Sequence, residues 1–217
     1  EITVSYNPSG TVLENAKKIS LIAYLYTKGN PEAKEFPAKK EKNRWIASFA
    51  TDKKTRGVIV KFQEEETIDN NNKQGYIITL YGKDGKRIPG ELAGLAEAYS
   101  SWGRYFVGLE AANELALSKF EEDFKINPEV KAEYLGSYLS LLVSLRTKDA
   151  NETILKELDE IAGKEDLSLE ELTMMVNIYR RINQPEKAEK YDQMIRHKDP
   201  KGDFVQAERF AEFYRTS

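Results

Sequence analysis

The sequence predicts a multidomain β + α protein, with a β-domain over residues 1–89 followed by an α-helical domain over residues 90–217. Two observations carry this prediction. Apolar residues recur with a period of two in the first part and with a period of roughly 3.6 in the second. The charge divides at the same place, because residues 1–90 carry 16 Lys or Arg against 11 Asp or Glu, whereas residues 91–217 carry 17 against 25. Net charges of +5 and −8 are typical of two modules of different character.

Short strand-like runs define the β-domain, and turns rich in Gly, Pro or Asn separate them. In the run at 18–27, both alternating sets of side chains are apolar. The charged stretch from Gly29 to Asn43 is expected to be a loop. Short strands at this spacing predict a β-sandwich of immunoglobulin type. The expected strands are residues 2–6, 18–27, 44–50, 58–63 and 76–81, with a short edge strand at 87–89.

Seven helices joined by short loops are expected in the second domain, a pattern typical of antiparallel helix pairs. Capping signals support several of their ends. Ser168 and Glu171 form a capping-box pattern, and Pro185 suits the first turn of its helix. The expected helices are residues 91–102, 106–124, 128–146, 149–162, 169–182, 185–197 and 203–214.

An aromatic group follows the junction between the two domains. Four aromatic rings bury a large area when they pack together, and two short domains need a fixed contact. We therefore expect these rings to fasten the first helices to the β-domain, the alternative being a groove for a peptide or a sugar. The residues are Tyr99, Trp102, Tyr105 and Phe106.

Composition argues against several kinds of site. The chain has no cysteine and one histidine, His197, which excludes thiol chemistry and argues against a His-pair metal site or a His-based triad. The basic residues are too dispersed for a nucleic-acid reader, and no apolar run approaches the ~20 residues that cross a bilayer. We expect no catalytic residue, no metal site and no cofactor, and hence a chain that is not itself an enzyme.

A polar turn at residues 69–75 separates two of the expected strands. Asn and Asp side chains offer paired donors and acceptors that suit sugar hydroxyls, and a Trp or Tyr ring offers a flat face for a pyranose. The alternative is a plain hairpin turn, because Asn and Gly tolerate left-handed backbone and Asx side chains bond nearby backbone. We expect the hairpin. A calcium loop is disfavoured because the spaced acidic positions are missing. The candidate ligand-binding residues are Trp45, Asp69, Asn70, Asn71, Asn72 and Tyr76.

Residues 172–200 resemble a tetratricopeptide repeat. The packing positions of the first helix hold Leu172, Met175, Val176 and Tyr179, and those of the second hold Ala188 and Ile195, before Asp199 and Pro200 close the unit. Such repeats bind extended segments of partner proteins through their inner helices. The resemblance therefore implies a protein or peptide partner, and the acidic charge favours a basic one. The residues expected in the partner groove are Asn177, Tyr179, Arg180 and Arg181.

The segment from Trp45 to Tyr81 resembles early-set immunoglobulin-like domains, including starch-binding modules, through Trp45, Phe62, the Asn-rich turn and Tyr76. The two modules in this order resemble the N-terminal region of periplasmic bacterial thioredoxin-like proteins of the TlpA type. The resemblance implies a non-catalytic binding or scaffolding region of a larger exported protein, periplasmic or extracellular. Any redox domain would lie beyond Ser217, because the chain contains no C-x-x-C motif. The alternative is a carbohydrate-binding module fused to a helical domain, with a polysaccharide as its ligand.

Overall fold

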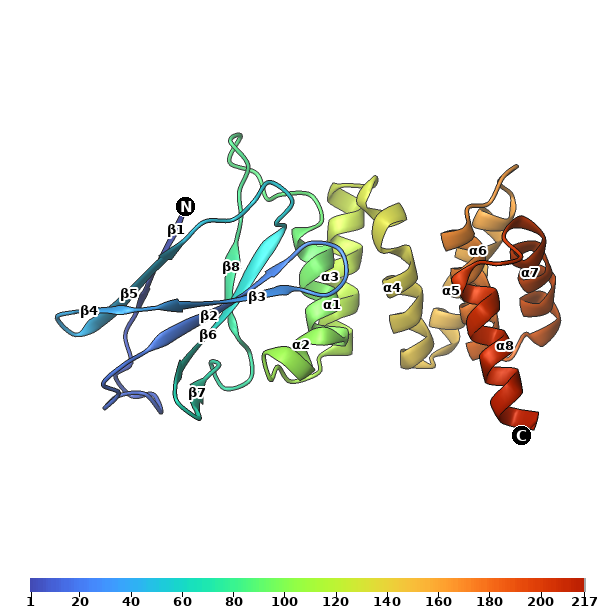
Figure 1. Cartoon of the computed structure of the whole chain (residues 1–217). Helices are drawn as coiled ribbons and strands as arrows, with labels where there is room; N and C mark the ends of the chain where they lie inside the picture. The colour runs from blue at the N-terminus through green and yellow to red at the C-terminus, as the bar shows by residue number, and fades with distance from the viewer. Residues whose placement is uncertain (217) are drawn as a thin grey trace. The chain divides into compact units, whose positions relative to one another are not determined.

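The computed structural model describes residues 1–216, with the side chains of all of these except residues 212, 215 and 216. Within this range the chain forms eight strands and then eight helices (Figure 1), which confirms the mixed β + α layout. The strands are β1 (Ile2–Tyr6), β2 (Ser20–Tyr26), β3 (Glu32–Pro37), β4 (Lys39–Glu41), β5 (Arg44–Phe49), β6 (Gly57–Glu64), β7 (Thr67–Asp69) and β8 (Tyr76–Thr79). The helices are α1 (Glu91–Ser100), α2 (Trp102–Phe106), α3 (Asn113–Ile126), α4 (Val130–Leu145), α5 (Lys148–Ala162), α6 (Leu169–Arg181), α7 (Pro185–Lys198) and α8 (Asp203–Thr216).

The chain divides into two compact units, Glu1–Leu135 and Gly136–Ser217. The first unit contains all eight strands together with α1, α2 and α3, and the boundary falls inside α4. This division differs from the one expected near residue 89. The change of hydrophobic period marks where strands give way to helices, but α1 and α2 share a core with the strands, and α3 packs against α1.

Two antiparallel sheets form the β part of the first unit. One has the strand order β1-β5-β4, and the other has the order β3-β2-β6-β7. Strand β8 also pairs with β6, at Gly57 to Val60, while β7 pairs with the other end of β6, at Phe62 to Glu64. The Asn-rich turn therefore links two short strands that lie on the same edge of β6.

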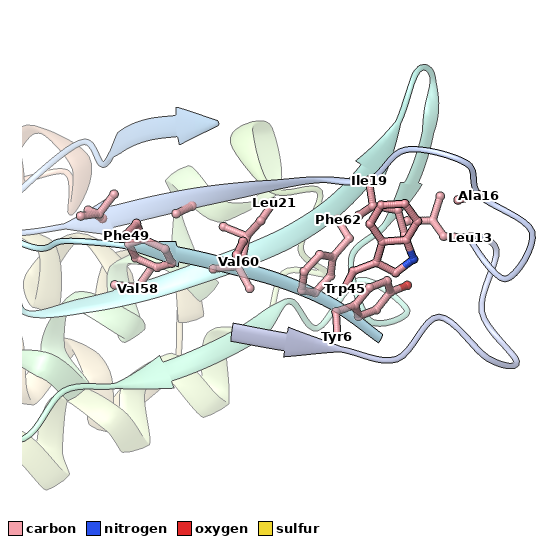
Figure 2. Packing of buried hydrophobic residues seen from close by; sticks show 13 residues of the cluster. Tyr6, Leu13, Ala16, Ile19, Leu21, Trp45, Phe49, Val58, Val60 and Phe62 are labelled. Carbon is pink, nitrogen blue, oxygen red and sulfur yellow. The ribbon is translucent and has the colours of Figure 1, made fainter. Parts of the chain in front are cut away.

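The two sheets share a hydrophobic core. Phe49 and Val58 lie toward one end of it, Leu21 and Val60 lie between, and Tyr6, Trp45 and Phe62 gather at the other end (Figure 2). The rings of Tyr6 and Phe62 stack with their centroids 3.8 Å apart. The buried members of this core are Tyr6, Leu13, Ala16, Ile19, Leu21, Ala23, Leu25, Trp45, Ala47, Phe49, Val58, Val60 and Phe62.

The opposite face of the β3-β2-β6-β7 sheet is buried by helices. Tyr24, Tyr26 and Ile59 pack there against Leu95, Ala98 and Trp102 and against the loop after α2. This second core explains why both faces of the run at 18–27 are apolar, since a strand covered on both sides alternates between two interiors. Period-two alternation does not identify three of the eight strands, and two of them, β3 and β4, lie in the stretch from Gly29 to Asn43 that was expected to be a loop. Strands β3, β4 and β7 carry mostly exposed, charged or polar side chains, as edge strands often do.

Three local expectations need correction. The helix expected from residue 106 begins at Asn113, because residues 107–112 form a loop in which Gly108 has a φ of +78°. The aromatic group divides, since Trp102 is buried and Tyr99 partly buried in the second core, whereas Tyr105 and Phe106 are 80% and 47% exposed. The edge strand expected at 87–89 is reduced to a single bridge between Tyr81 and Arg87.

Paired helices make up the second unit. Tyr179 of α6 stacks on Tyr191 of α7 with the ring centroids 5.7 Å apart. The capping box of Ser168 and Glu171 is confirmed at the start of α6, and Pro185 opens α7 as predicted. Other buried side chains of this unit are Leu139, Leu142, Ile154, Leu158, Ile161, Leu172, Met175, Val176, Ala188 and Ile195.

The contact between sheet and helix predicts a strong effect of a single methyl group. A Cβ at Gly94 of α1 would lie 2.6 Å from the buried Tyr26 ring. We expect Gly94→Ala to lower the free energy of unfolding by about 2 kcal/mol in urea denaturation, because the ring is too tightly packed to move aside.

Gly136→Ala is the matched control. A Cβ there would meet its nearest atom, Met174 Sδ, at 3.7 Å, an ordinary van der Waals distance. Alanine should stabilise α4 by about 0.5–1 kcal/mol relative to glycine. Equal effects of the two substitutions would show that Tyr26 does not limit the approach of α1 to the sheet.

Candidate functional site

The ligand-binding residues expected in the β-domain do not form an open site. The Trp45 side chain is 5% exposed and points into the core between the sheets (Figure 2), with Lys40 Nζ 5.6 Å from its ring centroid. Asp69 is 7% exposed, and Tyr76 is partly buried against Tyr6 and Phe62. The Trp45 ring therefore offers no face to a sugar.

The carboxylate of Asp69 is an internal acceptor. The Tyr6 hydroxyl donates to Asp69 Oδ2 at 2.5 Å, and the Tyr76 hydroxyl donates to the same oxygen at 2.9 Å. Asp69 Oδ1 accepts from the backbone N–H of Asn71 at 3.0 Å. Burial, followed by the hydrogen bond to Asp69, raises the pKa of Tyr76 to about 12, and the same two causes raise the pKa of Tyr6 above its ordinary range.

The asparagines of the turn fasten it to neighbouring backbone. Asn70 Nδ2 donates to the carbonyls of Val107 and Gly108 at 3.2 Å each, which ties the turn to the loop between α2 and α3. Asn71 Nδ2 donates to the Gly75 carbonyl at 3.0 Å. Asn72 is exposed, and its backbone, like that of Asn71, is left-handed. These contacts give the turn a structural role, but it does not close the expected hairpin, because β7 and β8 each pair with β6 and not with each other. Its docking onto the loop after α2 is a role that sequence reasoning missed.

The residues expected in the partner groove are dispersed over three environments. Asn177 is exposed and lines a cavity of the helical unit. Tyr179 is buried in its stack with Tyr191, so it is a core residue. Arg180 pairs with Glu208 at 2.6 Å. Arg181 lines a different cavity, and it donates to the Ser140 carbonyl at 3.1 Å.

The cavity beside Asn177 has a volume of about 570 Å³ and is formed by α4, α6, α7, α8 and the turn before α8. Apolar side chains from α6 and α8 form much of its wall, and carboxylates lie at Asp199 and Asp203. We call it the helical groove. Its other lining residues are Gly136, Ser140, Leu169, Glu170, Thr173, Met174, Ile178, Ile195, Gly202 and Phe204.

Small side chains on α4 keep the helical groove open. Gly136 and Ser140 lie four residues apart and so share one face of the helix. The space beside Gly136 would accept a Cβ in ordinary contact with Met174. A glycine within a helix costs roughly 0.5–1 kcal/mol relative to alanine, and packing does not require one here. The only sequence signal for this wall was the glycine inside an otherwise apolar helical run.

An ion-pair network holds α8 in place along the helical groove. Glu208 of α8 pairs with Arg180 of α6 at 2.6 Å and with Arg196 of α7 at 2.5 Å. Asp192, which is buried, pairs with Arg196 at 2.6 Å. Charges that form a network contribute more to stability than an isolated surface pair does, and Arg180 also lies over the ring of Phe204, 6.0 Å from its centroid, at the groove.

Among the described residues, no group of three or more His, Cys, Asp or Glu side chains is arranged to hold a metal ion. Within residues 1–216, no helix is both long and apolar enough to cross a membrane. Comparisons with protein-family models, with curated proteins and with solved structures gave no match.

The Asp69 network predicts loss of stability in alkali. An unfolded tyrosine ionises near pH 10, whereas Tyr76 in the fold does so near pH 12. Its contribution to stability is therefore complete below pH 10 and is lost as the pH rises through 12. We expect Tyr76→Phe to unfold about 1 kcal/mol more easily at pH 7, because one hydrogen bond is removed, but to lose less stability than the wild type between pH 10 and 12.

Chemical denaturation at several pH values measures both effects. Tyr81→Phe is the control, because Tyr81 is 60% exposed and its substitution should leave the stability at pH 7 unchanged. An alkaline slope in Tyr76→Phe as steep as in the wild type would contradict the prediction.

Proposed function

We propose that this chain is a non-catalytic protein-interaction region whose helical groove binds an extended segment of a partner protein. The observation that carries the proposal is the groove itself, an opening of about 570 Å³ with an apolar wall and carboxylates at Asp199 and Asp203. Grooves of this chemistry bind peptides that place an apolar side chain against the wall and a basic side chain beside the carboxylates.

The finer description of the fold belongs to the same proposal. We describe the β part as immunoglobulin-like, a reading supported by two antiparallel sheets that share one core, and the helical part as tetratricopeptide-like, supported by the α6–α7 hairpin and its capped turns. Membership of a larger exported thioredoxin-like protein stays a prediction. Sequencing the gene beyond the codon for Ser217 tests it, and a C-x-x-C domain there is the expected result.

Peptide selection tests the helical groove directly. We expect the wild-type protein to enrich peptides with apolar and basic residues from a displayed library of random sequences. Gly136→Leu should abolish capture of those peptides, because the longer side chain fills the space beside Met174. Asp203→Lys should weaken capture about tenfold or more by reversing a charge at the groove.

Matched controls separate loss of binding from loss of folding. Gly136→Ala keeps the groove open, and Asp149→Lys reverses an equivalent exposed charge in the first turn of α5, outside the groove. Asn177→Ala should weaken binding, whereas Gln193→Ala, an exposed amide on α7, should not. Enriched peptides that bind every variant equally, or no enrichment at all, would overturn the proposal.

A second candidate function, carbohydrate binding, is supported by one observation. Tyr105 and Phe106 expose their rings beside the loop that Asn70 holds. The Phe106 carbonyl accepts from the Tyr24 hydroxyl at 2.6 Å and from Lys61 Nζ at 3.1 Å, so the backbone under these rings is fixed. Exposed aromatic rings offer a flat face that suits a sugar ring.

Affinity electrophoresis through gels that contain soluble starch tests this second candidate. We expect retardation of the wild type and loss of that retardation in Tyr105→Ala and Phe106→Ala. Tyr81→Ala is the control, because Tyr81 is 60% exposed and lies away from the Asn70 contact. Unretarded migration of the wild type in starch and other polysaccharides would reject carbohydrate binding.

A further inference from the structure

A second cavity of the helical unit differs in charge from the helical groove. It has a volume of about 740 Å³ and lies where the turn between α4 and α5 meets the turn between α6 and α7. Among its described lining residues are two arginines and no carboxylate. We call it the arginine cavity. Its lining residues are Val143, Ser144, Arg146, Asn151, Leu155, Arg181, Ile182, Asn183 and Gln184.

The position of Arg181 is fixed by a backbone contact. Its Nη2 donates to the Ser140 carbonyl of α4 at 3.1 Å, which joins the end of α6 to the neighbouring helix. A guanidinium carries five N–H donors, so this contact leaves donors that a ligand can use. Arginine presents these donors in a rigid fork that matches the oxygens of a carboxylate or a phosphate.

Arg146 occupies a backbone position that favours glycine or asparagine. Its φ is +56°, which places it in the left-handed region directly after α4. Asn183, at the turn of the following helix pair, has a nearly equal φ of +59° and is a residue type that tolerates this conformation. The left-handed backbone therefore does not favour an arginine at position 146. The side chains of Arg146 and Asn183 line the same cavity.

The remaining walls suit a small anion with an organic body. Ser144, Asn151 and Gln184 offer hydroxyl and amide groups, and Leu155 and Ile182 offer an apolar surface. Gln184 precedes α7, a helix of 14 residues whose start carries no side-chain cap.

We propose that the arginine cavity binds a small organic anion, with Arg146 and Arg181 holding a phosphate or carboxylate group and Leu155 and Ile182 contacting its carbon body. This site is separate from the helical groove, because the two cavities share no lining residue. Failure of peptide binding would leave it untouched.

The test is an NMR titration of the isotope-labelled chain with inorganic phosphate in one arm and tricarballylate in the other. Each is compared with sodium chloride at equal ionic strength. We expect saturable amide shifts at residues 143–155 and 181–184, with a dissociation constant of about 1 mM or tighter. Shifts with phosphate alone identify a phosphate ligand, and shifts with tricarballylate alone identify a carboxylate ligand.

Arg146→Gly separates a loss of anion binding from a loss of folding stability. Glycine suits the left-handed backbone, so this variant should unfold at a higher urea concentration than the wild type and yet bind the anion about tenfold more weakly. Arg181→Gln should also weaken binding about tenfold, whereas Arg209→Gln, an exposed arginine of α8 outside the cavity, should not. The proposal is overturned if neither anion gives saturable shifts or if Arg209→Gln weakens binding as much as Arg146→Gly.

Discussion

The first unit depends on the burial of one sheet from both sides. Strands β2 and β6 direct Leu21, Val58 and Val60 toward the other sheet, and Tyr24, Tyr26 and Ile59 toward the helices. Tyr26 is fully buried, and its ring lies so close to Gly57 and Gly94 that a side chain at either position would collide with it. Its hydroxyl donates to the Glu91 carbonyl at 3.3 Å. Helix α1 can therefore approach the sheet only where the chain has no side chain.

This constraint also explains the role of the Asn-rich turn. Once α1 and α2 cover the sheet, the loop from Val107 to Gly108 must meet the edge formed by β7 and β8, and Asn70 provides the two hydrogen bonds there. Asp69 holds the base of the turn by accepting from Tyr6 and Tyr76. The densest polar run of the β-domain therefore stabilises the fold, and the surfaces that remain for ligands come from the helical segments.

Two cavities of the helical unit are opposite in character. The helical groove combines apolar side chains with Asp199 and Asp203, whereas the arginine cavity brings Arg146 and Arg181 together without a lining carboxylate. Each has a feature that local stability alone does not favour. In the groove this is Gly136 inside α4, and in the cavity it is the left-handed Arg146. Such departures from the locally most stable residue are often found where a protein binds something.

The sequence by itself determined that a β part precedes a helical part, and it determined the capped turns of the second part and both apolar faces of β2, because these follow from short-range periodicity and from the backbone preferences of single residues. It could not show that α1 to α3 belong with the sheets. Nor could it separate Trp102, which is buried, from Tyr105 and Phe106, which are exposed. Of the four residues expected in the partner groove, Asn177 alone lines the helical groove. Only tertiary packing decided these points. A cavity depends on which helix faces come together, and contacts between helices distant in sequence depend on the complementary shapes of their side chains.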